Sequence, residues 1–445
     1  MISDITNKRI WRIAYPIILG SIAQNLINVT DTAFLGRLGK IELGAAAIGG
    51  VFYLAIIMFG YGLGLGTQII VARRSGEGRQ EGIGTVMEHS LATLVLSSVL
   101  IFGLIKFFSP GFFSSIISSQ GVFEATRDYM KLRSWGIFFA FINIGFSAFY
   151  IGITRTGVIT WSTVLMAVIN IFLDYVLIFG KMGFPEMGIR GAAAASVSAE
   201  MSVTAFFVFY TLSLTDLKKY NLFTFTGFNF ELWKRLAGIS LPVMIQNFIS
   251  LAVWFVFFVF VEKMGETQLA ISNIIRSVYV ILMIPIQGFS SATNTLVSFL
   301  IGQGRLAGVL PVIYKTSWLC FLMVMVFVVF SLLMPSEIIG IYTDDPLLAE
   351  GSIPVLHVVS GSVICFAFAM VFLYGVSGTG KTQVALIMEM VVITVYLIAA
   401  YLFANVLSFS IALVWTVEFI YAILLFLLSF LYLKSGNWRK ASRRI

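Results

Sequence analysis

Twelve long apolar segments recur along the chain, and they constrain its fold more than any other feature of the sequence. A helix needs about 20 mostly apolar residues to cross a bilayer. Segments of this length, separated by only a few residues, favour helices over the strands of a barrel. The sequence therefore predicts an all-α polytopic membrane protein with spans at residues 10–34, 43–72, 88–108, 128–153, 160–180, 190–213, 236–261, 268–299, 311–334, 350–377, 383–404 and 409–433.

The composition excludes a water-soluble protein of this size. Of the 445 residues, 59% are hydrophobic and only 11% are charged, whereas a soluble domain carries about 25% charged residues. The two cysteines, Cys320 and Cys365, both lie in apolar runs, which excludes a disulfide scaffold. With only two histidines, the chain is poorly suited to hold zinc or haem, and we expect no cofactor.

The placement of Lys and Arg predicts the orientation in the membrane, because short loops rich in these residues face the cytoplasm. The formal net charge is +8. With the N-terminus inside, 19 of the 29 Lys and Arg residues fall in inner segments and nine in outer ones, while Arg276 lies within the eighth span. We therefore expect a plasma (inner) membrane protein with both termini in the cytoplasm. The basic excess is read as a topology signal, so no nucleic-acid partner is expected.

The two halves of the chain repeat each other. A shift of 226 positions pairs Pro16 with Pro242 and Gly62 with Gly288, among other residues. Six spans separate equivalent positions, so both halves have the same orientation in the membrane. Such pseudo-symmetric six-helix lobes around a central cavity are a transporter plan. The predicted domains are an N-terminal lobe with spans 1–6 (1–213), a cytoplasmic linker (214–235), a C-terminal lobe with spans 7–12 (236–433) and a basic cytoplasmic tail (434–445).

Several ionisable or amide side chains lie inside the spans, where they are costly and usually face a cavity or a partner. Asn170 and Asp174 are four residues apart and share one helix face. With Asp31 they offer the oxygens that a monovalent cation needs, and two neighbouring carboxylates in a desolvated site can also share a proton. Hydrogen bonding between helices is the open alternative. Further candidates for a substrate or secondary coupling role are Gln24, Asn28, Glu200, Arg276, Glu389 and Glu418.

For the three glutamates in this set the sequence identifies no partner. A structural role is the simpler interpretation of Arg276, whose long side chain can snorkel outward.

A series of short motifs resembles the multidrug and toxic compound extrusion (MATE) family over all twelve spans. Their fixed order within the repeat makes the resemblance more specific than any one of them. The motifs are Pro16 with Asp31, Gly36-Arg37-Leu38-Gly39, Gly76-Glu77-Gly78, Gly152-Ile153-Thr154-Arg155-Thr156-Gly157, Asn170-Ile171-Phe172-Leu173-Asp174, Gly191-Ala192-Ala193-Ala194-Ala195-Ser196 and Gly302-Gln303-Gly304.

This resemblance implies a secondary antiporter that exports organic cations in exchange for sodium ions or protons. It implies that Asp31, Asn170 and Asp174 form the cation-coupling site, with Ser196 where a threonine often contributes. One branch of the family has a glutamate in span 7, eight residues after the proline, but this chain has Ser250 there. The pattern is thus closer to the DNA-damage-inducible (DinF-like) branch, and the choice between sodium and protons stays open.

The expected partners are organic cations or drug-like small molecules and the lipid bilayer, with the protein as a monomer. Trp254 and Met283 are candidates for an adaptable apolar cavity that suits flat aromatic cations. A flippase for lipid-linked substrates is an alternative, although only Arg276 could hold a pyrophosphate. A polytopic membrane enzyme is the other alternative. Residues 375–382 fit the phosphate-loop pattern but link two spans without a preceding strand, so we expect a turn there and no enzyme.

Overall fold

The computed structural model describes residues 5–225 and 227–441, and every regular element in these two ranges is a helix. Eleven helical segments are long and apolar enough to cross a membrane, or twelve if the bent pair α4–α5 is counted as one span. The predicted all-α fold is thus confirmed. Thr226 of the predicted linker and residues 442–445 of the predicted tail lie outside the described residues.

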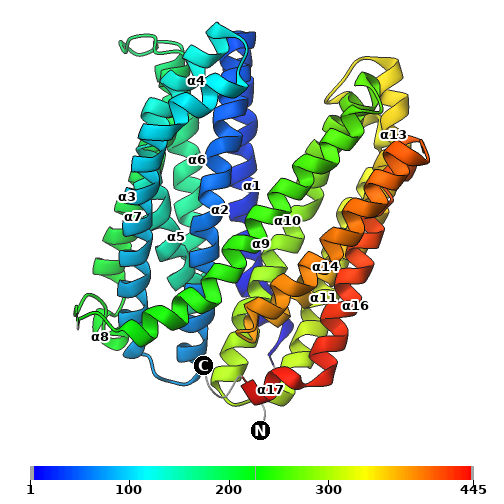
Figure 1. Ribbon diagram of the computed structural model, residues 1–445. Coiled ribbons are helices and arrows are strands. Elements are labelled where there is room, and N and C mark those ends of the chain that lie inside the picture. Colours follow the sequence, from blue (N-terminus) through cyan, green and yellow to red (C-terminus); the bar gives the residue numbers. More distant parts are fainter. Residues whose placement is uncertain (1–4, 226, 442–445) are drawn as a thin grey trace. The chain divides into compact units, whose positions relative to one another are not determined.

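The helices follow one another as labelled in Figure 1. Their bounds are α1 (Asn7–Leu38), α2 (Lys40–Gly76), α3 (Gly82–Ile116), α4 (Gln120–Arg133), α5 (Gly136–Gly152), α6 (Gly157–Ile178), α7 (Ile189–Leu214), α8 (Leu217–Tyr220), α9 (Phe230–Glu262), α10 (Glu266–Gly302), η1 (Leu306–Gly308), α11 (Val309–Leu333), α12 (Pro335–Gly340), α13 (Pro346–Gly378), α14 (Thr382–Tyr401), η2 (Leu402–Val406), α15 (Ile411–Val414), α16 (Val417–Ser435) and α17 (Asn437–Ala441).

The fourth span is bent rather than straight. Its two helices, α4 and α5, meet at an angle of 50° at Ser134 and Trp135. The side chain of Ser119 caps α4 by accepting a hydrogen bond from the backbone N–H of Val122. The bend brings Arg133, the last residue of α4, next to Gly136, the first residue of α5.

The internal repeat is visible in the helices themselves. α2 and α10 each contain 37 residues, and their bounds are offset by 226 positions at both ends. Each is followed by a turn that needs a left-handed backbone, at Gly78 (φ 73°) and Gly304 (φ 72°). Glycine adopts this conformation without the steric cost that other residues incur.

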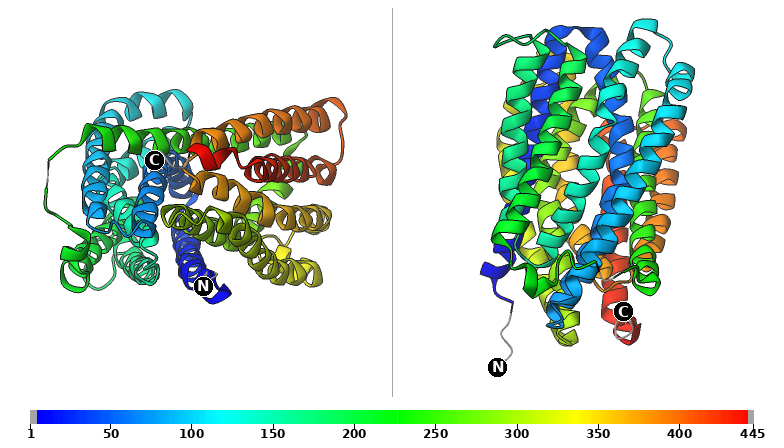
Figure 2. Two further views of the ribbon diagram at one scale, coloured as in Figure 1. Left: turned by 90° about the horizontal axis from the view of Figure 1, so that it is seen from below. Right: turned by 90° about the vertical axis from the view of Figure 1, so that its left-hand side faces the viewer.

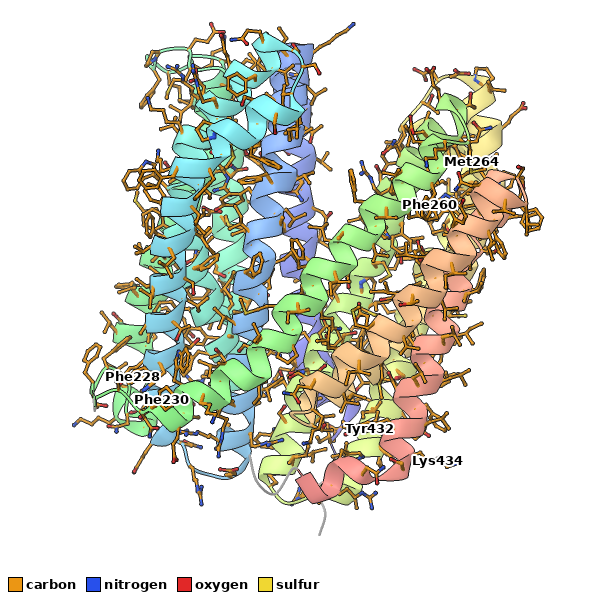
Figure 3. All side chains as sticks on the ribbon, in the orientation of Figure 1. Phe228, Phe230, Phe260, Met264, Tyr432 and Lys434 are labelled. Carbon is orange, nitrogen blue, oxygen red and sulfur yellow. The ribbon has the colours of Figure 1, made fainter. Side chains whose placement is uncertain are left out.

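The helices pack into two compact units, and the chain passes between them inside α1 and inside α9. One unit is residues 19–244, here called the N-unit. The other, the C-unit, comprises residues 1–18 and 245–445, of which 5–18 and 245–441 are described. Figure 3 labels Phe230 near the start of α9, in the N-unit, and Phe260 near its end, in the C-unit. The predicted division by sequence repeat, with boundaries at 213 and 236, stays a prediction.

In the N-unit, α2, α3, α5, α6 and α7 run lengthwise beside one another (Figures 1 and 2). Glycines on two faces of α2 allow this close packing. Gly60 and Gly64 lie against Ile144 of α5. Gly62 and Gly66 lie on another face of α2, against Met244 and Ser240 in the first part of α9.

The C-unit repeats the second of these contacts with the equivalent residues. Gly288 of α10 lies against Ala14 and Ile18 in the first part of α1. In the repeat with its shift of 226 positions, Gly62 is equivalent to Gly288, and Ile18 is equivalent to Met244. The first parts of α1 and α9 are therefore exchanged between the two units, and both exchanged segments are seated on a glycine of the long second helix of each repeat.

Within the C-unit, α13 packs against α10, α11, α14 and α16. Large side chains such as Phe257, Phe372 and Trp415 are fully buried in its core. α1 begins and α17 ends at the same end of this unit (Figures 1 and 2). A chain that crosses the membrane an even number of times has both ends on the same side, as this arrangement requires.

A methyl group at Gly62 should destabilise the protein. An added Cβ would lie 2.7 Å from the backbone nitrogen and 2.8 Å from the Cα of Met244, and backbone atoms cannot rotate away. We expect Gly62→Ala to lower the free energy of unfolding by about 1–3 kcal/mol, measured by denaturant titration of the purified protein in detergent. Gly44→Ala in the same helix is the control, because a Cβ there meets nothing within 4 Å. Equal stability of the two variants would contradict this packing.

Candidate cation-coupling site

The predicted coupling residues come together in the N-unit. α6 presents Asn170 and Asp174 on one face, with exposed fractions of 1% and 0%. The second part of α1 brings Asp31 to them, and its carboxyl group lies within direct interaction range of the Asp174 carboxyl. Gly20 allows the approach of α1, since an added Cβ would lie 3.2 Å from the hydroxyl of Thr163 on α6.

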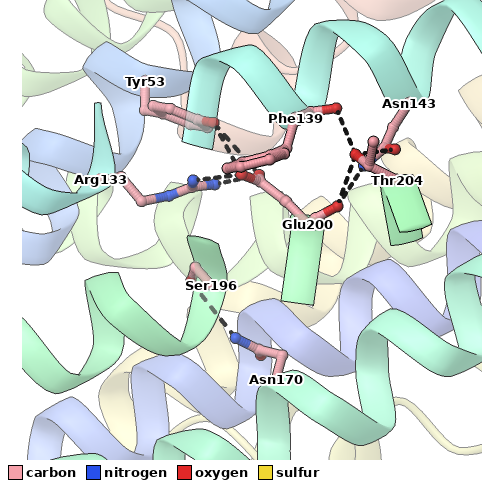
Figure 4. A network of polar contacts seen from close by, with 8 residues as sticks. All are labelled: Tyr53, Arg133, Phe139, Asn143, Asn170, Ser196, Glu200 and Thr204. Atoms are coloured by element: carbon pink, nitrogen blue, oxygen red, sulfur yellow. Dashed lines mark hydrogen bonds and ion pairs between the residues drawn. The ribbon is translucent and has the colours of Figure 1, made fainter. Parts of the chain in front are cut away.

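The carboxyl oxygens of this cluster lack hydrogen-bond donors. Among the described residues, no group donates to Asp31 Oδ1, to either carboxyl oxygen of Asp174, or to Asn170 Oδ1, although all four atoms are buried. Asn170 donates from Nδ2 to Ser196 Oγ of α7 at 3.5 Å (Figure 4). Buried ionised carboxylates without donors or a countercharge are strongly destabilised. The cluster is therefore electrostatically complementary to a proton or another small cation.

Glu200 lies in a different environment, in which its carboxylate is fully paired. Arg133 donates from Nη1 to Oε2 at 2.9 Å and from Nη2 to Oε1 at 2.7 Å. The Tyr53 hydroxyl donates to the same carboxylate at 3.3 Å, and its ring lies 3.6 Å from the guanidinium carbon. Figure 4 shows this network, in which Asn143 and Thr204 also donate to the Glu200 backbone carbonyl.

Arg133 is a buried residue for which the sequence predicted no role. Its exposed fraction is only 8%. The signal was available, because Arg133 falls inside the predicted fourth span at 128–153. After Arg133 the chain bends, and its guanidinium reaches Glu200 of α7.

The two other intramembrane acids, Glu389 and Glu418, lie in the C-unit and are paired with neutral donors. Glu389 of α14 accepts hydrogen bonds from Gln246, from Ser250 at 2.5 Å and from Tyr421 at 3.0 Å. Glu418 of α16 accepts from the hydroxyls of Tyr279 at 3.3 Å and Tyr396 at 3.0 Å. The sequence showed no partner for either glutamate, because these donors lie on other helices.

The remaining candidates do not join the aspartate cluster. Trp254 packs against the rings of Phe258 and Tyr279 in the C-unit, and the Arg276 guanidinium lies over the Phe258 ring at 5.3 Å. Met283 is a half-buried residue of the C-unit. Gln24 and Asn28 lie on the second part of α1, half-buried and exposed respectively. A substrate role for these five residues stays a prediction.

Two other kinds of site receive no support. Within residues 5–225 and 227–441, no three His, Cys, Asp or Glu side chains are grouped so that they could hold a metal ion. Residues 375–382 form the end of α13, a turn with Gly380 at φ 85°, and the start of α14. A phosphate loop needs a strand before the turn, and here the preceding element is a membrane helix.

Gly136 makes room for the buried ion pair, and this can be tested. A Cβ at position 136 would collide with Arg133 Nη1 and Glu200 Oε2. We expect Gly136→Ala to displace the two side-chain ends and to lower the free energy of unfolding by about 1–3 kcal/mol, because a methyl group is forced into an occupied, buried site. Denaturant titration in detergent measures the loss. Gly157→Ala, where a Cβ meets nothing within 4 Å, is the matched control. A Gly136→Ala protein as stable as this control would contradict the assigned geometry.

Comparison with known proteins gives one consistent result. The MatE family model matches residues 16–176 and 242–402, once in each repeat. A "Probable multidrug resistance protein NorM" from Thermotoga maritima is 27% identical over 444 residues, covering 97% of this chain and 93% of that protein. The protein of the same name from Rhizobium meliloti is 27% identical over 335 residues, covering 74% and 70%. The solved structure of a MOP superfamily transporter from Pyrococcus furiosus superposes with a TM-score of 0.90 at 21% identity, covering 96% of each chain.

Proposed function

The chain belongs to the MatE family, whose members are transporters rather than enzymes, and we propose that it is a secondary antiporter for multidrug efflux. In this proposal it exports amphiphilic, mostly cationic organic compounds in exchange for protons or sodium ions. The relatives from Thermotoga maritima and Rhizobium meliloti carry multidrug resistance names, which supports this substrate class. A flippase or a membrane enzyme is not favoured by any of these relationships.

The observation that carries the proposal is the contrast among the five intramembrane acids. Glu200 is neutralised by an arginine, and Glu389 and Glu418 are saturated by amide and hydroxyl donors. Only the Asp31 and Asp174 carboxyls have buried oxygens without donors among the described residues. Their charge is therefore the one that an incoming cation can neutralise. We assign them as the coupling acids, with Asn170 and Ser196 as supporting ligands.

Cation binding at this pair provides a physical basis for coupling. Two like charges close together in a desolvated site repel each other, and one proton or sodium ion relieves the repulsion. Loading the site then favours closer packing of α1 against α6, and unloading favours separation. A change in the balance between two such states is what alternating access requires. The central cavity, the monomeric state, the inner-membrane location and the cytoplasmic termini belong to the same proposal.

The assignment to the DinF-like branch rests on the C-unit. Ser250 occupies the position where the other branch has a glutamate, and its hydroxyl donates to Glu389. Glu389 thus lies near the position of that missing carboxyl, but its three neutral donors satisfy it. We propose that coupling in this chain depends on the N-unit aspartates alone.

Neutralising either aspartate should abolish coupling. We expect Asp31→Asn and Asp174→Asn to reduce gradient-driven ethidium transport in liposomes by at least about 100-fold, because an amide in place of the carboxylate removes the charge that the cation neutralises. Proton and sodium gradients are applied separately, so the ion that drives wild-type transport is identified in the same experiment.

Asp344→Asn is the control, since Asp344 is an exposed acid outside the spans, and it should transport as the wild type does. A stably inserted Asp174→Asn protein with wild-type flux would remove Asp174 from the mechanism. Ethidium transport that neither gradient drives would contradict the antiporter proposal as a whole.

A further inference from the structure

The buried ion pair of Arg133 and Glu200 lies within electrostatic reach of the aspartate cluster. All of these residues are in the N-unit. The charge of Arg133 acts on Asp31, and the Tyr129 hydroxyl lies beside the Arg133 guanidinium and within range of both Asp31 and Glu200. Ser196, one helical turn before Glu200 on α7, accepts a hydrogen bond from Asn170 of the cluster, so α7 connects the ion pair to the coupling site.

Arg133 is held by Glu200 through both ends of its guanidinium group. Its two terminal nitrogens each donate to a different carboxylate oxygen, the fork-shaped arrangement that is strongest for an arginine. The Tyr53 ring covers one face of the guanidinium at 3.6 Å. Because Gly136 has no side chain, the ion pair can occupy the space beside its Cα.

The pairing of Arg133 with Glu200 determines the charge balance around the aspartates. The network and the cluster together contain three carboxylates, of Asp31, Asp174 and Glu200, and the guanidinium of Arg133. If Arg133 is neutralised by Glu200, the aspartates have no resident countercharge and need a mobile cation. If Arg133 were free, its guanidinium would stabilise the ionised aspartates and compete with that cation.

We propose that Glu200 is a positioning residue that sequesters Arg133 and thereby sets the cation affinity of the Asp31–Asp174 pair. This inference rests on the proposed function of that pair. Glu200 does not bind the transported cation in this account, and it acts only through Arg133. Among the described residues, the other titratable groups that act on the network are the hydroxyls of Tyr53 and Tyr61 on α2 and Tyr129 on α4, and a tyrosine adds no charge to the count at neutral pH.

The test compares Glu200→Gln with the double variant Arg133→Gln/Glu200→Gln. The single change frees the arginine, whereas the double change removes both charges and restores the original balance. We expect Glu200→Gln to raise the cation concentration for half-maximal ethidium transport by about tenfold or more, the effect of one unpaired charge beside a carboxylate. The double variant should return to within about threefold of the wild type.

A second readout does not depend on transport. Cation binding to the folded protein raises its melting temperature, so the sodium or proton concentration that gives half of this rise should shift in the same order as the transport values. A purely structural pair predicts another pattern, in which both variants lose stability and neither changes the cation dependence. That pattern would overturn the inference.

Arg133→Gln alone keeps the test decisive if Glu200→Gln does not fold. Removing the arginine leaves an additional buried negative charge, so half-maximal transport should need less cation, and an unchanged or higher requirement would overturn the inference. The two proposals fail in different ways. Wild-type transport by Asp31→Asn contradicts the coupling site, whereas an unchanged cation dependence in Glu200→Gln, with Asp31→Asn inactive, contradicts only the role of Glu200.

Discussion

Buried carboxylates must be paired with a countercharge, satisfied by donors, or neutralised by a cation, and this requirement organises the polar interior of the protein. All three solutions occur among its five intramembrane acids. Glu200 has an arginine, and Glu389 and Glu418 have neutral donors from neighbouring helices. Among the described residues, no group donates to Asp31 Oδ1 or to either carboxyl oxygen of Asp174. Polar groups that are already satisfied hold helices together, and the unsatisfied pair is the one that can respond to ions.

Glycine packing fixes the long second helix of each repeat against its neighbours. Gly62 contacts the first part of α9, and Gly288 contacts the first part of α1. Each unit therefore contains a helical segment from the other repeat. Both α1 and α9 are single helices that pass through the two units. α1 also carries Asp31 in its second part. A packing change at the aspartate pair therefore acts on a helix whose first part is anchored in the C-unit.

The sequence was sufficient for the features that depend on local pattern. Apolar length predicted the twelve spans, and helical periodicity placed Asn170 and Asp174 on one face. Features that depend on long-range pairing were not visible. The hydroxyls that satisfy Glu418 come from Tyr279 and Tyr396, which are separated from it by 139 and 22 residues. The role of Arg133 was missed because a 50° bend within its span is set by tertiary packing rather than by apolar content.

Hydrogen–deuterium exchange tests most directly whether the coupling cation acts on the N-unit aspartates. The purified protein in nanodiscs would be compared at high and low concentrations of the coupling cation, with exchange followed by peptide. The account predicts changes concentrated in the second part of α1, around Asp31, and in α6, with α14 and α16 little affected. Cation-dependent changes confined to α14 and α16, with α1 and α6 unchanged, would show that the coupling site lies at Glu389 and Glu418 instead.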